Sequence, residues 1–484
     1  MIKKPALYLA LFVLLCFIYL QITSGIIASS DGASGLLEGR DLAAGNILLR
    51  GWSLSTVSFY FTDLIWYATA TLLAGYGGWQ SSLLPSMMLA ILSVFAIYLA
   101  VKDGKKNLWP IVIGFAAPGA FAALNTLMPV IHIGTYIYIL GCFMLADRYA
   151  NRGGVGCLAA LVALLAVTLF SDDISSYLAV VPLCLSYGYA AYQRKSAKHA
   201  GVVAMAILSY LLAKLIAVGF DALGGFYLPG IPSPTFVNFD DIGNNLYLFT
   251  KGIILYFNAD IFGKSPASKQ AVFYLINLFG MLLFFLNLAL VAKKIKRLSP
   301  LDIALGLAAL IMIPAYLTSN RPIDVFAVRY LVPVFIFGAI FIARNIEMNA
   351  KLSYLLTAVF IIAAAGSWRV EPVRSNPDEI VNQLKDAIRN NHLQRGYATF
   401  WYASSVSIDG DISIAPVEID QNTRKISASR WLSHERWYTR GGDFFIADSP
   451  EMAELIKSHY GDPVRVIAVN EKSLLIYQRN IVID

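Results

Sequence analysis

The feature that most constrains this chain is a series of long apolar runs separated by short polar loops. At about 20 residues each, the runs are long enough to cross the hydrocarbon core of a bilayer as α-helices. In lipid every backbone N–H and C=O must find an internal partner, so a spanning segment is either a helix or a strand of a closed barrel. The runs lack the alternation of barrel strands. The sequence therefore predicts a polytopic α-helical membrane protein.

The composition agrees with this prediction. Hydrophobic residues make up 57% of the chain and charged residues only 14%, whereas soluble domains carry about 25% charged residues. The net charge of +7 arises from Lys and Arg that gather in short loops on one side, which is a topology signal. It does not indicate a nucleic-acid partner. Cys16, Cys142, Cys157 and Cys184 all fall inside apolar runs, where cysteine acts as a small packing residue.

About eleven spans are predicted from the lengths and spacing of the apolar runs. They cover residues 6–28, 82–101, 108–127, 132–146, 155–171, 174–191, 200–219, 271–292, 300–318, 329–345 and 352–368. The first is expected to be an uncleaved helix, because it is longer than the apolar core of a signal peptide and many spans follow.

The distribution of cations predicts the orientation, because cytoplasmic loops are enriched in Lys and Arg. The cations of the predicted cytoplasmic segments are Lys3, Lys4, Lys102, Lys105, Lys106, Arg148, Arg152, Arg194, Lys195, Lys198, Lys293, Lys294, Lys296, Arg297, Arg344 and Lys351. Two loops on the other side, around 125–132 and 171–176, hold neither Lys nor Arg. An odd number of spans follows, with the N-terminus inside and the C-terminus outside.

Two predicted outer segments are large and rich in apolar residues, at 29–80 and 220–270. Residues 59–76 are apolar enough for a span, but counting them as one would place Lys102 outside. They are therefore predicted to form a helix on the outer membrane rim, where tryptophans are favoured. Both segments are expected to pack over the membrane face and to wall a cavity.

The composition changes near Arg369, which divides the chain into a membrane domain (1–368) and a small soluble α/β domain (369–484) on the outer face. Within the second domain, helices are predicted at 380–391, opened by Asn376-Pro-Asp-Glu, and at 451–459. Strands are predicted at 397–401, 412–419, 444–447, 464–469 and 474–479. His434, Glu435 and Arg436 are predicted to form an ordinary exposed turn.

Chemically capable side chains concentrate in the predicted outer loops. They are Asp31, Asn125, His132, Asp172, Asp173, Arg321, Asp324, Arg329 and Tyr330. Charges close to the membrane are costly and usually functional. Each also has a structural explanation: the aspartates could cap helices, His132 could be a structural hydrogen-bonding residue, and Arg329 with Tyr330 could reach lipid headgroups. No P-loop, GxSxG, HExxH or paired CxxC motif is present.

Several short motifs carry a resemblance to a known family. The first outer loop reads SSDGASGLLEGRDLAAGNILLRGWSLSTVSFYFTDLIWY, with an acid soon after the first span, then GNILLRGW, then an aromatic segment ending in Thr62-Asp63-x-x-x-Tyr67. MPVIHIGTYIY, FSDDISSYL and RYLVPVF follow in later loops, and GYATFWYASSVSIDGDISIAPV lies in the C-terminal domain. The chain resembles bacterial multispan proteins related to GT-C-type glycosyltransferases.

This resemblance implies an enzyme of the bacterial cytoplasmic membrane that takes a sugar from a polyprenyl-phosphate donor at the outer face. The acceptor would be a cell-envelope glycan, lipid or protein. It implies that Asp31 is the general base and that Arg329, with Arg321 and His132, holds the phosphate. Asp172 and Asp173 would orient a substrate or hold a divalent metal ion, and Tyr330 and Asn125 would contact substrate.

The sequence departs from the family in that Gly32, not a second acid, follows Asp31, which leaves Asp41 and Glu38 as substitutes for the base. Two other hypotheses stay open: a non-catalytic glycolipid-binding subunit, and a transporter of lipid-linked glycan. A transporter would be expected to bury charges at mid-membrane and to show repeated halves. Lys214 is the one obvious charge deep within a predicted span.

Overall fold

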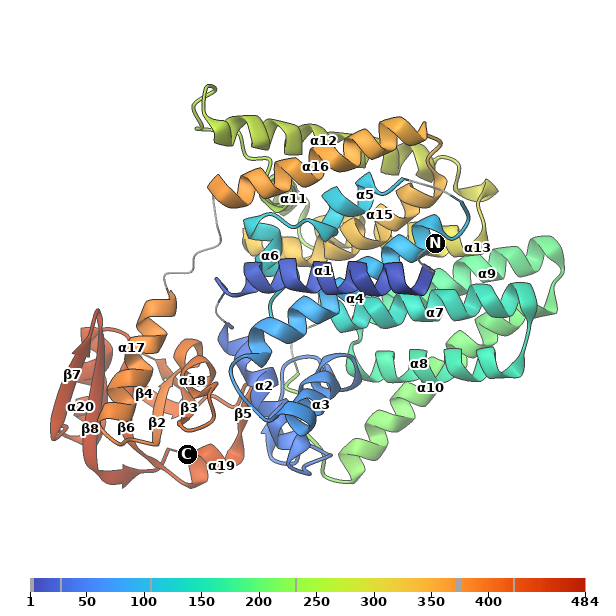
Figure 1. Cartoon of the computed structure of the whole chain (residues 1–484). Helices are drawn as coiled ribbons and strands as arrows, with labels where there is room; N and C mark the ends of the chain where they lie inside the picture. The colour runs from blue at the N-terminus through green and yellow to red at the C-terminus, as the bar shows by residue number, and fades with distance from the viewer. Residues whose placement is uncertain are drawn as a thin grey trace.

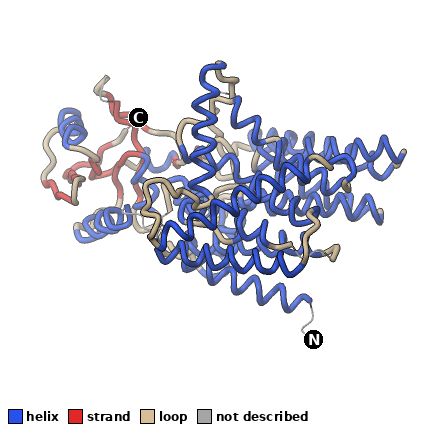
Figure 2. The backbone as a smooth tube through the Cα atoms, turned by 90° about the horizontal axis from the view of Figure 1, so that it is seen from above, coloured by secondary structure: helices blue, strands red, loops and turns tan. Residues whose placement is uncertain are grey.

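The computed structural model describes residues 4–26, 28–104, 107–230, 233–370, 377–420 and 423–483. Long helices run side by side, horizontally in Figure 1, and a smaller region with a β-sheet lies at one end of them. We call this end of the bundle the sheet end. The first helix begins at the opposite end, and the view from above places the strands and the N-terminus at opposite sides as well (Figure 2). The fold class predicted from the sequence is confirmed.

Each predicted span has a helical counterpart. The helices that coincide with predicted spans are α1 (Lys4–Thr23), α4 (Gln80–Val101), α5 (Trp109–Ile111) with η2 (Val112–Ala116) and α6 (Ala120–Thr126), α7 (Ile133–Arg152), α8 (Val155–Ser171), η3 (Ser176–Val180) with α9 (Val181–Arg194), α10 (Ala197–Ala222), α12 (Lys269–Ala292), α13 (Pro300–Leu310) with α14 (Met312–Thr318), η6 (Val325–Leu331) with α15 (Val332–Asn345), and α16 (Ala350–Val370). Within the described residues, seven helices are long and apolar enough to cross a membrane, or eight if the bent pair around Pro118 counts as one span.

That bent pair turns by 75° between residues 116 and 120. Proline at position 118 cannot donate a backbone hydrogen bond and disfavours helix in the residue before it, so the helix stops there. The carbonyl of Pro118 accepts a hydrogen bond from the indole of Trp368 at 2.8 Å. The backbone freed by the break is thus bonded by α16.

The two large loops are folded rather than extended. Residues 29–80 form α2 (Ser30–Ala43), the short strand β1 (Trp52–Ser53), η1 (Tyr60–Leu64) and α3 (Ile65–Ala74), so the helix predicted within 59–76 is present. The 220–270 segment holds η4 (Phe239–Asp241) and α11 (Ile242–Tyr256), which were not predicted. Helix α11 packs against η6 and α14, and its buried Asn245 donates to the carbonyls of Leu317 and Ser319.

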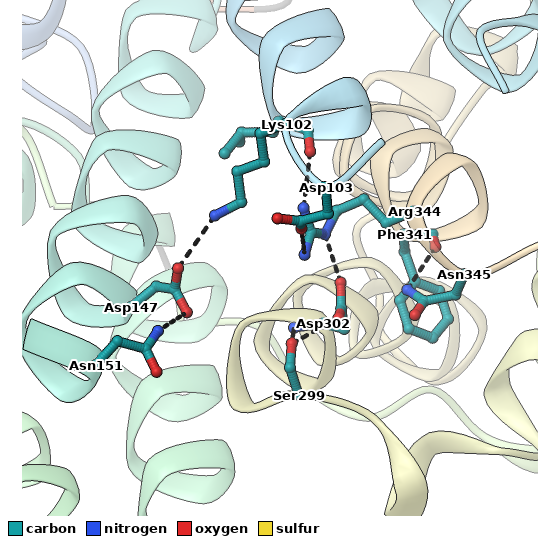
Figure 3. A network of polar contacts seen from close by, with 10 residues as sticks. Lys102, Asp103, Asp147, Asn151, Ser299, Asp302, Phe341, Arg344 and Asn345 are labelled. Atoms are coloured by element: carbon teal, nitrogen blue, oxygen red, sulfur yellow. Dashed lines mark hydrogen bonds and ion pairs between the residues drawn. The ribbon is translucent and has the colours of Figure 1, made fainter. Parts of the chain in front are cut away.

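At the end opposite the sheet, an ion-pair network joins four helices (Figure 3). Arg344 of α15 binds Asp302 of α13 at 2.5 Å and Asp103, just after α4, at 2.9 Å, and it donates to the Leu99 carbonyl. Lys102 pairs with Asp147 of α7 at 3.1 Å. Arg344 was predicted from the sequence to be one of the cations of the cytoplasmic loops. Its side chain is instead buried, and two carboxylates compensate its charge there. Lys3, Lys105 and Lys106 lie outside the described residues.

The C-terminal region is a six-stranded mixed sheet in the order β4-β3-β2-β6-β8-β7. Its elements are α17 (Pro377–Asn390), β2 (Arg395–Thr399), α18 (Phe400–Ser407), β3 (Ser413–Asp420), β4 (Lys425–Ala428), β5 (Ser433–His434), α19 (Glu435–Thr439), β6 (Gly442–Ala447), α20 (Pro450–Tyr460), β7 (Arg465–Val469) and β8 (Lys472–Ile481). The strand predicted at 397–401 ends early, because Trp401 belongs to α18. Asn376, predicted to open α17, lies outside the described residues.

The turn at 434–436 is not an ordinary exposed turn. Strand β5 pairs with β1 of the 29–80 segment, with Trp52 opposite His434. His434 is buried and Arg436 binds Asp41 at 3.0 Å. The prediction failed because the residues that cover this turn lie almost 400 positions earlier in the chain. The sheet region is therefore fixed to the first loop of the bundle.

Candidate functional site

A His–Asp pair lies at the sheet end of the bundle, with Asp172 buried and His132 half-buried. His132 Nδ1 lies 2.6 Å from Asp172 Oδ2, and the Thr135 hydroxyl donates to the same oxygen at 2.7 Å. Burial alone would lower the pKa of His132, but the Asp172 carboxylate raises it above its usual value. The pair therefore favours the imidazolium form of His132 relative to a free histidine.

The backbone around His132 is strained. His132 has φ of 66° and Val130 has φ of 56°, both in the left-handed region. Phe59 also has a positive φ, of 49°, and its ring meets the His132 ring edge to face at 4.9 Å. Such conformations cost energy in non-glycine residues and cluster at functional sites. Packing here is close as well, because a Cβ on Gly134 would lie 1.9 Å from the Thr62 carbonyl oxygen.

Asp63 and Tyr67 form a second buried group beside this pair. Both are at most 1% exposed, and Asp63 Oδ2 and the Tyr67 hydroxyl have no hydrogen-bond partner among the described residues. Burial raises the pKa of Asp63 to about 7, while His132 acts to lower it. Unpartnered buried polar atoms are rare and call for a water or a ligand. Neither residue was among the predicted site residues, although both belong to the Thr62-Asp63-x-x-x-Tyr67 motif that carried the family resemblance.

Asp31 and Arg329 come together from distant segments. Asp31 lies in the first turn of α2, and the adjoining Gly32 packs on Pro129 of the loop that leads to His132. Arg329 lies at the end of η6 and acts electrostatically on both Asp31 and His132. Protein surroundings raise the pKa of Asp31, and the charge of Arg329 opposes this rise. The arrangement places the exposed Asp31 carboxylate and His132 within the electrostatic reach of Arg329.

The two substitute bases are differently placed. Glu38 is buried with Oε1 lacking a partner among the described residues, and burial raises its pKa to about 8. It is therefore mostly protonated at neutral pH and is a poor base. Asp41 accepts hydrogen bonds from Trp52 and Asn46 and binds Arg436, and these partners hold its pKa below the usual value. Asp31 remains the candidate base.

The other predicted site residues are spread around this centre. Tyr330 lies under the Arg329 guanidinium, 5.2 Å from ring centre to Cζ. Arg321 is half-buried in the loop between α14 and η6. Asn125 is buried and donates to the Phe121 carbonyl of its own helix at 2.8 Å, which is a structural role.

Asp172 and Asp173 have different partners, although they are adjacent in sequence. Asp172 is 1% exposed and faces His132, whereas Asp173 is largely exposed and lies 3.9 Å from Lys214 of α10. The described residues contain no group of three or more His, Cys, Asp or Glu side chains that could hold a metal ion. The possible metal role of the two aspartates thus gains no support from their geometry.

The fold and these residues define a polytopic membrane protein with a GT-C-like fold, whose polar centre lies where the bundle meets the sheet region. Among solved structures the chain is similar to ArnT from Cupriavidus metallidurans bound to undecaprenyl phosphate. The likeness covers 97% of each chain, with a TM-score of 0.52 and 11% identity, and it therefore shows a shared fold. No family model and no curated protein match the sequence.

Proposed function

We propose that this protein is a glycosyltransferase that moves a sugar from a polyprenyl-phosphate donor to a cell-envelope glycan, lipid or protein. The reaction would take place at the outer face of the bacterial cytoplasmic membrane. In this orientation the N-terminus is cytoplasmic, and the sheet end, with the C-terminal region, is extracytoplasmic. The observation that carries the proposal is the His132–Asp172 pair at the sheet end of the bundle, with the charge of Arg329 acting on both His132 and Asp31.

The fold supports the nature of the donor. A protein with the same fold has been solved with undecaprenyl phosphate, which is a phosphate on a long isoprenoid chain. Such a chain must stay in the bilayer, so its phosphate can only reach groups near the membrane surface. Arg329 is exposed at the start of a spanning helix, and a guanidinium binds phosphate through paired hydrogen bonds.

The chemistry proposed for these residues is a displacement at the anomeric carbon of the sugar. The acceptor hydroxyl attacks that carbon and gives its proton to Asp31, while the bond from carbon to the phosphate oxygen breaks and polyprenyl phosphate leaves. Arg329 and protonated His132 stabilise the negative charge that develops on the leaving phosphate. A carboxylate with a raised pKa accepts a proton better than a fully hydrated one.

The transporter alternative is less well supported. It expects a charged pathway at mid-bundle, whereas Lys214, the charge deepest within a predicted span, pairs with Asp173 beyond the end of α8. A non-catalytic glycolipid-binding subunit would use Arg329 and His132 in the same way but would not need Asp31. The role of Asp31 therefore separates the two remaining functions.

The first test compares Asp31→Asn with Arg329→Met and with Arg148→Met, which removes an exposed arginine at the opposite end of the bundle. Two quantities are measured: the envelope glycan composition of a deletion strain complemented with each variant, and undecaprenyl phosphate binding by the purified proteins. Asp31→Asn should lower sugar transfer by about 100-fold or more, the usual effect of losing a general base, and should leave binding intact. Arg329→Met should weaken binding by about tenfold or more.

Arg148→Met should behave as wild type in both measurements. Normal transfer by Asp31→Asn would contradict catalysis through this residue and favour the binding subunit. Unchanged binding by Arg329→Met would remove the phosphate site, and an unaltered glycan in the deletion strain would remove the function.

A further inference from the structure

A cavity with apolar and charged lining residues lies behind the His132–Asp172 pair. It has a volume of about 330 Å³ and lies between the loop before η1, the end of α8, the start of η3 and the last turns of α10. This volume falls in the range of about 300–1,000 Å³ that is usual for small-molecule sites. Asp172 forms part of its wall, but Asp31, His132 and Arg329 do not line it. It therefore adjoins the candidate active site and shares Asp172 with it.

One face of α10 forms a side of the cavity. The residues of this face are Tyr210, Ala213, Lys214, Ala217 and Asp221, and their spacing of three or four places them on one side of a helix. The two alanines leave the space that larger side chains would fill. Helix α10 also diverges from α8 toward the sheet end (Figure 1), and the cavity lies where the two separate.

The charges in the cavity alternate in sign. Lys214 lies 3.9 Å from Asp173, and Asp221 lies two turns further along the same face of α10. Asp173 and Lys214 are more than half exposed, so neither is taken up by a tight ion pair. Tyr210 lies below the ammonium at 5.4 Å. Asp172, the third carboxylate of the wall, is buried and bonded to His132 and Thr135. The exposed charges are thus one cation between two carboxylates, which is complementary to a group that carries both a phosphate and an amine.

The cavity is accessible from the side of the bilayer. Leu211, Leu215 and Val218 are each at least 59% exposed on α10, as expected for a lipid-facing surface. Lys214 lies eight residues before the end of α10, or about 12 Å along the helix. Its long side chain reaches toward Asp173, just after the end of α8, as lysines do near a membrane surface. The charged groups thus lie toward the end of α10, beside an exposed apolar surface of the same helix.

We infer that this cavity binds a zwitterionic phospholipid headgroup, with its phosphate on Lys214 and its amine between Asp173 and Asp221. The acyl chains lie along the exposed apolar residues of α10. The inference rests on the cavity and its charges and does not depend on the proposed transfer reaction.

The test uses the full chain, purified in detergent and stripped of lipid. The probes are phosphatidylethanolamine and phosphatidylglycerol with identical acyl chains, and bound lipid is counted by native mass spectrometry. Wild type should retain phosphatidylethanolamine about fivefold or more over phosphatidylglycerol. Lys214→Met should reduce that retention by about tenfold, because it removes a charge-assisted contact to phosphate. Asp173→Asn combined with Asp221→Asn should abolish or reverse the preference.

Lys198→Met is the matched control, since Lys198 is an exposed lysine at the other end of the same helix; it should retain lipid as wild type does. Gel filtration and thermal unfolding of each variant verify folding. Equal retention of the two lipids by wild type, or a Lys214→Met variant that matches Lys198→Met, would overturn the inference.

A competition arm separates a membrane lipid from a free ligand of the same chemistry. Displacement of bound lipid by soluble phosphoethanolamine would show that the headgroup alone is recognised, and a lack of displacement would show that the acyl chains contribute. Either result is compatible with the site. Equal displacement by inorganic phosphate would contradict a role for the carboxylates and would overturn it.

Discussion

Three acids of the 29–80 segment have raised pKa values because protein atoms displace water around them, although only Asp63 and Glu38 are buried and Asp31 is exposed. Their neighbours give them different chemistry. Asp31 faces the cation of Arg329. Asp63 lies beside both His132 and Asp172, and it titrates near neutral pH. Glu38 is shifted by burial alone. A carboxylic acid side chain can therefore serve as a base, as part of a buried network or as a neutral core residue, and only the surroundings distinguish these roles.

Glu38 gives a prediction for the pH dependence of stability. The unfolded chain loses this proton near pH 4.5, whereas the folded chain keeps it to about pH 8. The folded state binds more protons between these values, so this residue makes stability fall as pH rises from 4.5 to 8. Glu38→Gln should remove that fall and stabilise the protein at pH 9 by about 5 kcal/mol, since each pKa unit of the difference corresponds to about 1.4 kcal/mol. Thermal unfolding at pH 6 and pH 9 measures the difference.

Glu347→Gln, at an exposed glutamate, is the control for this prediction and should follow wild type at both pH values. If Glu38→Gln keeps the wild-type pH dependence, then Glu38 is ionised in the folded chain and has an unseen cation or water around it.

At the scale of elements, α2 is held from two sides. Toward the bundle, Gly35 and Gly39 allow close contact, since a Cβ on either would meet Val130 or Tyr67 within 2.5 Å. Toward the sheet region, Ser34 bonds Ser404 at 2.8 Å and Arg40 donates to the Gly410 carbonyl. The sheet region therefore helps to position the helix whose first turn carries Asp31.

Asp41 is the central contact between the 29–80 segment and the sheet region, and its removal tests how much this contact contributes to stability. Asp41→Ala leaves Trp52, Asn46 and Arg436 without their acceptor, which should cost about 2–3 kcal/mol. Hydrogen exchange should accelerate in residues 433–439, which pair with this loop, and much less in β6, which lies within the sheet. Asp240→Ala, at an exposed aspartate, should change neither. Equal acceleration in both segments would mean that the sheet region unfolds as one unit with its attachment.

The elements also show what a sequence can reveal. The spans were predictable because an apolar run has one stable arrangement in lipid. Helix α11 was missed because three prolines (Pro229, Pro232 and Pro234) precede it, and the whole segment was interpreted as a loop. Helix α18 was missed because Phe400 and Trp401 extend the pattern of strand β2. The contact of His132 with Asp172 agrees with the prediction that their loops lie on one side of the membrane. The burial of Asp63 depends on contacts that no local pattern records.

At the scale of the whole molecule, the Arg344 network (Figure 3) ties together the helix ends farthest from the sheet. Arg344→Met would leave Asp302, which is 6% exposed, as an unpaired buried carboxylate. A loss of about 3–5 kcal/mol in stability is expected, visible as a lower thermal unfolding midpoint. Lys102→Met breaks a more exposed pair and should cost about 1 kcal/mol or less. Restoration of the midpoint by adding Asp302→Asn to Arg344→Met would identify the orphaned carboxylate as the cause.

The orientation of the molecule decides whether the proposed reaction can occur, because the donor site must face away from the cytosol. The sheet region and the turn after α12 lie at opposite ends of the bundle (Figure 1). One labelling site in each is therefore sufficient to determine which end faces the cytosol. In a chain whose four cysteines are replaced by alanine, Glu471→Cys in the exposed β7–β8 turn and Lys296→Cys after α12 provide single labelling sites. A membrane-impermeant maleimide applied to intact spheroplasts should label position 471 at least about tenfold faster than position 296, and lysis should make both reactive, because a charged reagent does not cross the hydrocarbon core. Labelling of position 296 alone would put Asp31 and Arg329 on the cytosolic side, where the proposed outer-face transfer could not take place.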